Sequence, residues 1–172
     1  TVANVEALFP VAVTAGSVLP TTIAPEVTAL VRAIAERRVQ RRYLAIAHGV
    51  PREASFTVDA PIGRDPRSRI RMAIVATAAG GREARTDVRL VAAHPGGSAL
   101  QCTLHSGRTH QIRVHLAARG LPLVADALYG GRPALGLARQ ALHARQLAFE
   151  HPIDGRALAF VCPLPADFAR AW

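Results

Sequence analysis

The sequence contains no lysine, so all 21 of its Lys and Arg positions are arginines. A guanidinium is a planar fork of donors that matches two phosphate oxygens at once, whereas an ammonium is a more strongly hydrated point charge. A GC-rich coding sequence would give the same bias, and both explanations stay open. The formal net charge of +9 holds under either one. It makes a polyanion such as nucleic acid the first partner to expect.

Cysteine is scarce too, since only Cys102 and Cys162 are present, far apart and each within an apolar run. We expect both thiols to be buried and reduced. Two such residues form neither a CxxC pair nor a zinc spacing, which excludes a disulfide framework and indicates no metal site. His110 and His115 lie five residues apart. On a helix this separates them by roughly 140°, too far to share one metal.

Uninterrupted apolar runs long enough to cross a bilayer are missing. Residues 1–20 are apolar, but they lack a positive leading segment and are interrupted by Pro10 and Pro20. No basic amphipathic helix favours a membrane surface. We therefore expect a cytoplasmic protein without a membrane partner. Its 172 residues, half of them apolar, fit one domain over residues 1–172, and we expect a monomer.

Hydrophobic periodicity predicts few helices and many strands. Apolar residues at helical spacing predict a helix over 25–38, with Pro25 in its first turn. Asp154-Gly155 marks a hairpin turn, and other glycine-rich turns are typical of antiparallel meanders. The expected strands cover about residues 43–48, 71–78, 85–93, 98–105, 142–150 and 156–162. The pattern predicts an α+β fold with a mixed, mainly antiparallel sheet and few helices.

Two basic segments are candidate binding sites. Residues 60–71 hold two prolines, one glycine and four arginines, which excludes a regular element and predicts an exposed cationic loop. Thr109 can cap a helix that Gly120 ends, and Arg108 precedes it, so this side chain and the first free amides of the helix would attract phosphate. Arg113, one turn further, could pair with a carboxylate or phosphate. On spacing alone, solvated charges on an ordinary helix fit equally well.

One block of the sequence reads Gly107-Arg108-Thr109-His110-Gln111-Ile112-Arg113-Val114-His115-Leu116. This block resembles the last signature of the RluA-type pseudouridine synthases. The resemblance covers about residues 36–167. Further matching blocks follow the family's order: Arg42-Tyr43-Leu44-Ala45 with Gly49, Ala60 through Arg64 with Met72, Asp126 through Gly130, Leu142-His143-Ala144 with Phe149, His151 and Pro152, and Pro163 through Pro165.

The resemblance implies a function. The family isomerises uridine to pseudouridine in RNA, without a metal or organic cofactor, on a mixed sheet whose cleft holds a flipped-out base. Structured RNA, either ribosomal or transfer RNA, is the partner that this implies. A base must be unstacked before its glycosidic bond is attacked, and cationic groups must hold the strand meanwhile.

Roles for single residues come from the same resemblance. Tyr43 would pack on the target uracil and take part in proton abstraction, and Arg113 would pair with the catalytic aspartate. The expected RNA contacts are basic or polar residues near the cleft or in the 60–71 loop: Arg41, Arg42, Arg64, Arg67, Arg108, Thr109 and His110.

The chain departs from the family at the catalytic aspartate, which belongs to a block resembling His-Arg-Leu-Asp followed by Thr-Ser-Gly. Aligning Thr14-Ala15-Gly16 with that block puts Val11 at the place of the aspartate, and a shift of one residue puts Ala12 there. No Asp precedes Asp59. We therefore expect residues 1–24 to be degenerate relative to the family, with part of the sheet and the nucleophile missing.

Residues 25–172, in contrast, match the family well. Isomerase activity is expected to be impaired or lost, with RNA binding retained. Three alternatives stay open: an active synthase that uses Asp59, Asp65 or Asp126, a pure RNA- or protein-binding module, and a fragment without a function of its own.

Overall fold

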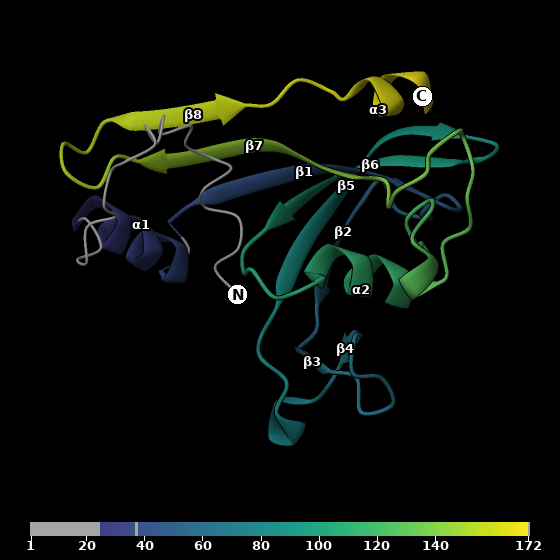
Figure 1. Ribbon diagram of the computed structural model, residues 1–172, viewed down its shortest axis with the longest axis horizontal. Coiled ribbons are helices and arrows are strands. Elements are labelled where there is room, and N and C mark those ends of the chain that lie inside the picture. The colour runs from purple at the N-terminus through teal and green to yellow at the C-terminus, as the bar shows by residue number, and fades with distance from the viewer. Residues whose placement is uncertain (1–24, 37, 172) are drawn as a thin grey trace, which may run out of the picture.

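The computed structural model describes residues 25–36 and 38–171 (Figure 1). Its centre is a six-stranded sheet in the order β2-β5-β6-β1-β7-β8, in which all neighbouring strands are antiparallel. The strands of this sheet are β1 (Gln40–Ala47), β2 (Ser55–Asp59), β5 (Arg85–His94), β6 (Gly97–Leu104), β7 (Leu142–Glu150) and β8 (Ala157–Val161). The predicted α+β class with a mainly antiparallel sheet is confirmed.

A small antiparallel hairpin, β3 (Ile62–Arg64) and β4 (Met72–Ile74), lies apart from the main sheet on the side of α2 (Figure 1). The helices are α1 (Pro25–Ala35), α2 (Gln111–Ala118) and α3 (Ala166–Ala171), and two 3-10 turns are η2 (Thr77–Ala79) and η3 (Ala127–Tyr129). None of the helices described is long and apolar enough to cross a membrane.

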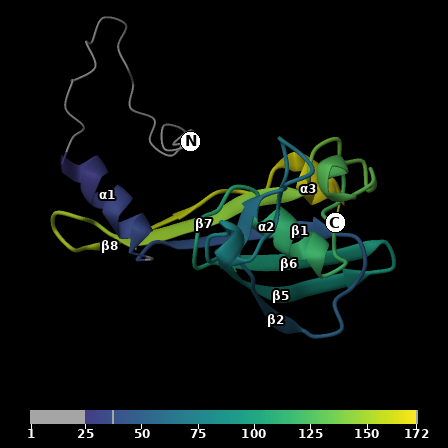
Figure 2. The ribbon, with the colours of Figure 1, turned by 90° about the horizontal axis from the view of Figure 1, so that it is seen from below.

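Alternation along β1 divides the core between the two faces of the sheet. Tyr43, Ala45 and Ala47 point to the face on which α2 packs, and the core there contains Ile112 and Leu116 of that helix. Figure 2 shows α2 lying along this part of the sheet. Leu44 and Ile46, which alternate with these residues along β1, point to the opposite face. There they pack in a second core with Val124, Leu137 and Phe168, the last of which belongs to α3. β1 is therefore covered on both faces, and it fixes the position of Tyr43.

Most predicted elements are found, and the turn at Asp154-Gly155 does connect two antiparallel strands, β7 and β8. The prediction for residues 60–71 is partly wrong, since β3 lies within them. Ile62 is buried against Ala84, Val114 and Tyr129, and this burial holds a short strand in a segment rich in proline and arginine. The four arginines of the segment are exposed, as predicted.

Two other predicted limits differ from the structure. The first helix ends at Ala35 instead of residue 38, and the strand expected over 71–78 is confined to Met72–Ile74. A 3-10 turn replaces the rest of that strand, and Gly80, with φ of 90°, ends it in a left-handed conformation.

The two cysteines differ in exposure. Cys102 is buried in the core on the α2 side, and its burial raises the pKa of its thiol to about 12. Cys162 is exposed, so the prediction that both are buried is wrong. It follows the end of β8, which pairs only with β7 among the strands described, so no further strand covers it.

Candidate functional site

The turn that leads into α2 is held by a single buried side chain, Gln111. Its Nε2 donates to the carbonyl oxygen of Arg85 and to Thr86 Oγ1, both at 3.0 Å. Its Oε1 accepts from Ser106 Oγ at 2.8 Å and from the amide of Arg108 at 3.0 Å. These contacts fasten the turn to β5, so the residues around it have a fixed position.

The predicted cap at Thr109 is wrong, because α2 begins at Gln111 and His110 occupies the cap position. His110 has a φ of 57°, in the left-handed region, and makes no side-chain cap. The side-chain carbonyl of Gln111 accepts from the backbone amide of Arg108, which precedes the helix, so this bond holds the turn and does not cap α2. Thr109 is exposed.

Arg108 does not point where the sequence suggested. Its Nε donates to the carbonyl oxygen of Glu83 at 2.9 Å, so its side chain lies along the loop before β5. The amide of Gln111, at the start of α2, donates to the carbonyl oxygen of Arg108 at 3.1 Å. The expected convergence of this side chain with free helix amides is therefore not found.

His115, one turn after Gln111, belongs to the same buried network. Its Nε2 lies 3.0 Å from the carbonyl oxygen of Ala60 and its Nδ1 lies 2.9 Å from Thr86 Oγ1. Burial lowers the pKa of His115, so the neutral ring donates to Ala60 and accepts from Thr86. Among the described residues, no group of three or more His, Cys, Asp or Glu side chains is placed to hold a metal ion.

Arg113 forms a bidentate ion pair with Asp126. Its Nη2 lies 2.7 Å from Oδ1, and its Nε lies 2.8 Å from Oδ2. The side chain of Asp126 is 1% exposed and that of Arg113 is 13% exposed. The hydrogen bonds to Asp126 raise the pKa of Arg113. A carboxylate does pair with Arg113, as the sequence allowed, and this carboxylate is Asp126.

Tyr129 connects this ion pair to the β3–β4 hairpin. The guanidinium carbon of Arg113 lies 4.8 Å from the centre of its ring, and that of Arg71 lies 5.4 Å from it. Its hydroxyl accepts from the amide of Met72 at 2.9 Å and lies 2.8 Å from Nδ1 of His110. Burial, followed by the charge of Arg113, lowers the pKa of His110, which favours a neutral ring that accepts from the hydroxyl.

Tyr43 lies in the middle of β1, half-buried, and packs against the core under α2. Burial raises the pKa of its hydroxyl, and the charge of Arg41 opposes this in part. Both side chains line a hollow of about 140 Å³ together with Leu147 of β7 and Phe160 of β8. Within the described part of the chain, no hydrogen bond or ion pair joins Tyr43 to Arg113. The remaining lining residues are Ala144, Arg145, Gln146 and Cys162.

The other predicted RNA contacts lie at two places. Arg42, next to Tyr43, donates from Nη1 to Gln146 Oε1 at 3.3 Å. Arg64 and Arg67 lie in the β3–β4 hairpin, where both side chains are exposed. Val11 and Ala12 lie outside the described residues.

Among the described residues that line the hollow at Tyr43, none carries a carboxylate. Asp126 is occupied by Arg113 inside the protein. Asp65 accepts from the amide of Arg67, and Asp59 is exposed at the end of β2. Asp59, Asp65 and Asp126, the three acids that could replace the missing nucleophile, therefore do not line this hollow.

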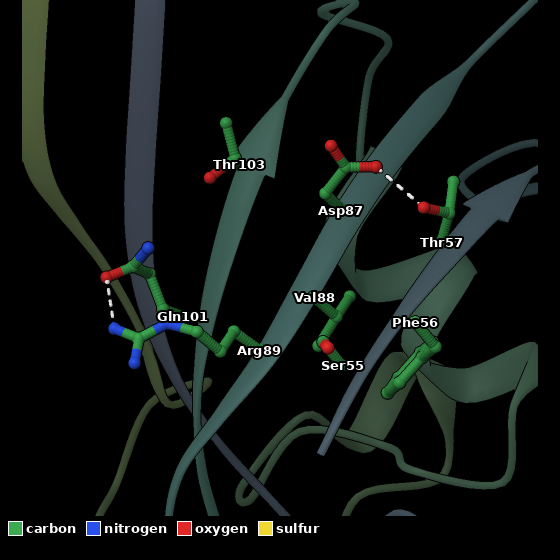
Figure 3. A pocket seen from close by; sticks show the side chains of 8 residues that line it. All are labelled: Ser55, Phe56, Thr57, Asp87, Val88, Arg89, Gln101 and Thr103. Atoms are coloured by element: carbon green, nitrogen blue, oxygen red, sulfur yellow. Dashed lines mark hydrogen bonds between the residues drawn. The ribbon is translucent and has the colours of Figure 1, made fainter. Parts of the chain in front are cut away.

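A second hollow, of about 360 Å³, opens over β2, β5 and β6 (Figure 3). Its polar groups bind one another: Thr57 Oγ1 donates to Asp87 Oδ1 at 2.8 Å, and Arg89 Nη2 donates to Gln101 Oε1 at 3.2 Å. Asp87 and Arg89 alternate with Val88, which points into the core under α2. This hollow is therefore on the face opposite to Tyr43.

A sequence profile described as RNA pseudouridylate synthase matches residues 12–118. The chain belongs to this family. A protein of Chloroflexus aurantiacus named "Uncharacterized RNA pseudouridine synthase" is 51% identical over 76% of this chain and 40% of its own length. Ribosomal large subunit pseudouridine synthase D of Xanthomonas campestris is 42% identical over 83% of this chain and 46% of its own.

Solved structures agree with this assignment. The human RNA pseudouridylate synthase domain containing 1 is 30% identical with a TM-score of 0.67, over 83% of this chain and 63% of that one. This chain therefore has the fold of a pseudouridylate synthase domain. It spans less than half the length of the two bacterial relatives.

Proposed function

We propose that this chain binds structured RNA, ribosomal or transfer RNA, on the side of the sheet that carries Tyr43. The observation that supports this is the hollow in which a half-buried tyrosine and a guanidinium lie together, inside the segment that matches the family. In this proposal Tyr43 packs on the target uracil and Arg113 maintains the neighbouring structure. The strand is held on this side by Arg41, Arg64, Arg67, Arg108, Thr109 and His110. Arg42 is a further proposed contact, although its side chain starts from the opposite face of β1. A single domain, a monomeric state and a cytoplasmic location are parts of the same proposal.

We further propose that the residues of this chain do not isomerise uridine on their own. The family reaction needs an aspartate beside the tyrosine, and the described residues that line the hollow at Tyr43 include no carboxylate. Asp126 is buried, and both of its carboxylate oxygens bind Arg113. It therefore cannot attack a base without breaking this ion pair. Binding without catalysis is therefore the activity expected of these residues.

The test is to incubate the purified chain with unmodified ribosomal and transfer RNA, hydrolyse the RNA, and measure pseudouridine by chromatography of the nucleosides. RNA binding without pseudouridine above the protein-free control is the expected result. An Arg113→Ala variant is run in parallel, with circular dichroism to check its fold.

Pseudouridine formed by the unaltered chain would contradict the proposed inactivity. In that case the variants Asp59→Asn, Asp65→Asn and Asp126→Asn identify the acid, because only the residue that performs the chemistry abolishes the product. Tyr43→Phe keeps the ring and removes the hydroxyl, so it separates base packing from proton transfer.

A further inference from the structure

Arg41 forms no hydrogen bond or ion pair with another side chain among the residues that the structure describes. Its Nε is buried without a hydrogen bond, and no hydrogen bond or ion pair to its guanidinium is found among the described residues. Burial lowers the pKa of Arg41, which means that the charge is partly removed from water. Arg113, in contrast, is buried against the carboxylate of Asp126. A desolvated charge without a partner is unfavourable, so an anion that reached Arg41 would be bound strongly.

Gly107 lies against the guanidinium of Arg41. A Cβ built on Gly107 would overlap Nη1 of Arg41, so a side chain there would shift the guanidinium from its place beside the turn into α2. Arg41 and Tyr43 are two residues apart on β1 and therefore lie on one face, and both line the same hollow. Arg145 lines it as well, but its guanidinium is bonded to the carbonyl oxygen of Cys162. Of the described arginines that line this hollow, Arg41 is thus the one whose guanidinium donates to no described acceptor.

We propose that Arg41 binds a phosphodiester group of the RNA strand whose base packs on Tyr43. This inference rests on the proposed function and names a contact within it. A nucleotide that places its base in the hollow carries a phosphate with it, and the planar guanidinium matches two phosphate oxygens. Carboxylates, the other anions that a guanidinium pairs with, do not occur among the described residues of the lining.

An arginine that served the fold alone would behave differently. Its removal would leave a protein acceptor unpaired and lower the stability of the free protein. Within the described part of the chain Arg41 has no such acceptor, so Arg41→Gln is expected to leave the urea midpoint of unfolding unchanged or to raise it. Loss of RNA affinity without loss of stability is therefore the signature of the proposed role.

The experiment measures the affinity for a fluorescein-labelled RNA stem-loop with unpaired uridines, by anisotropy at one fixed salt concentration. Arg41→Gln is expected to weaken binding about tenfold or more, since a hydrogen bond to a charged group contributes roughly 1.5–3 kcal/mol. The control is Arg89→Gln, which removes the same charge from the opposite face of the sheet, where Arg89 binds Gln101 (Figure 3). It is expected to change affinity less than twofold.

Gly107→Ala tests the geometry. It is expected to weaken binding in the presence of Arg41 and to add little in the Arg41→Gln background, because both changes act on one contact. Equal losses for Arg41→Gln and Arg89→Gln, or unchanged affinity for Arg41→Gln, would overturn this inference alone. Absence of RNA binding by the unaltered chain would overturn the proposed function together with it.

Discussion

The two side chains of the Arg113–Asp126 ion pair differ in their exposure to solvent. Arg113 keeps some contact with solvent, and Asp126 has almost none. Arg113→Ala therefore leaves an uncompensated carboxylate inside the protein. Breaking a buried pair in this way costs about 3–5 kcal/mol, so we expect a loss of that size in the free energy of unfolding, measured in urea.

A pair at the surface provides the comparison. Arg139 Nε lies 2.9 Å from Asp167 Oδ2, and the two side chains are 44% and 29% exposed, respectively. Arg139→Ala is expected to cost at most about 1 kcal/mol, because water solvates the remaining charge. If the two alanine variants lost the same stability, burial would not be what makes the Arg113 pair strong.

His115 makes the stability dependent on pH. Burial lowers the pKa of His115 in the folded protein below its ordinary value of about 6.5, so the unfolded chain binds the proton more readily. The stability from neutral His115 is fully present above about pH 6.5 and is lost as the pH falls from there toward the folded pKa. Urea unfolding at pH 7.5 and 5.5 measures the decrease.

His115→Gln removes that titration, so the difference between the two pH values should become smaller in this variant. The nearby carboxylate of Asp59 acts in the opposite direction, since its charge raises the pKa of His115. Asp59→Asn should therefore make the pH dependence of the unaltered protein steeper. A steeper dependence in His115→Gln would assign the effect to other groups.

Sequence analysis found some of these residues and missed others for a physical reason. Tyr43 and Arg113 were recognised from signature blocks that are continuous in sequence. Gln111 was missed as an organiser because Thr86, one of its partners, lies 25 residues away and is brought near only by β5. The helix cap was wrongly predicted at Thr109, because the sequence does not show that the side-chain amide of Gln111 forms hydrogen bonds with the turn before the helix.

At the level of elements, the β3–β4 hairpin depends on Tyr129. The Tyr129 hydroxyl accepts from the amide of Met72 in β4, and its ring lies close to Arg71, the residue before that strand. Tyr129→Phe keeps the ring and leaves the Met72 amide without its acceptor. We expect faster hydrogen exchange at this amide, by about tenfold for a hydrogen bond of roughly 1–1.5 kcal/mol.

The amides of β5 and β6 serve as the control for that measurement. They pair within the main sheet and should exchange at unchanged rates in Tyr129→Phe. Faster exchange in both sheets would mean that the variant lowers global stability instead of releasing the hairpin.

Elements with a regular alternation were predictable, and those fixed by distant contacts were not. The long strands β5, β6 and β7 have alternating or apolar runs bounded by turn residues. β3 contains Gly63 and Arg64 next to two prolines, a composition typical of loops, and only burial of Ile62 against residues far along the chain makes it a strand. Cys162 was misjudged because its neighbours are apolar although β8 has an open edge.

Two properties of the whole molecule could be predicted from the sequence: its α+β fold class and its net charge. Strand alternation and turn spacing suffice for the class, because each depends on local order. The face of the sheet that holds the hollow at Tyr43 could be identified only from the structure. β7 pairs with β1 from roughly a hundred residues further along the chain, and β8 pairs with β7 (Figure 1).

The net charge of +9 predicts how RNA binding responds to salt. Each phosphate neutralised by the protein adds about 0.7–0.9 to the slope of log affinity against log salt, so the five proposed arginine contacts together give a slope of about −4. Between 50 and 200 mM salt the affinity for the RNA stem-loop should then fall by about 100-fold or more. A module that bound a protein through an apolar surface would show a slope near zero, because burial of apolar area releases no condensed counterions. A flat dependence for the RNA would contradict phosphate contacts and favour the protein-binding alternative.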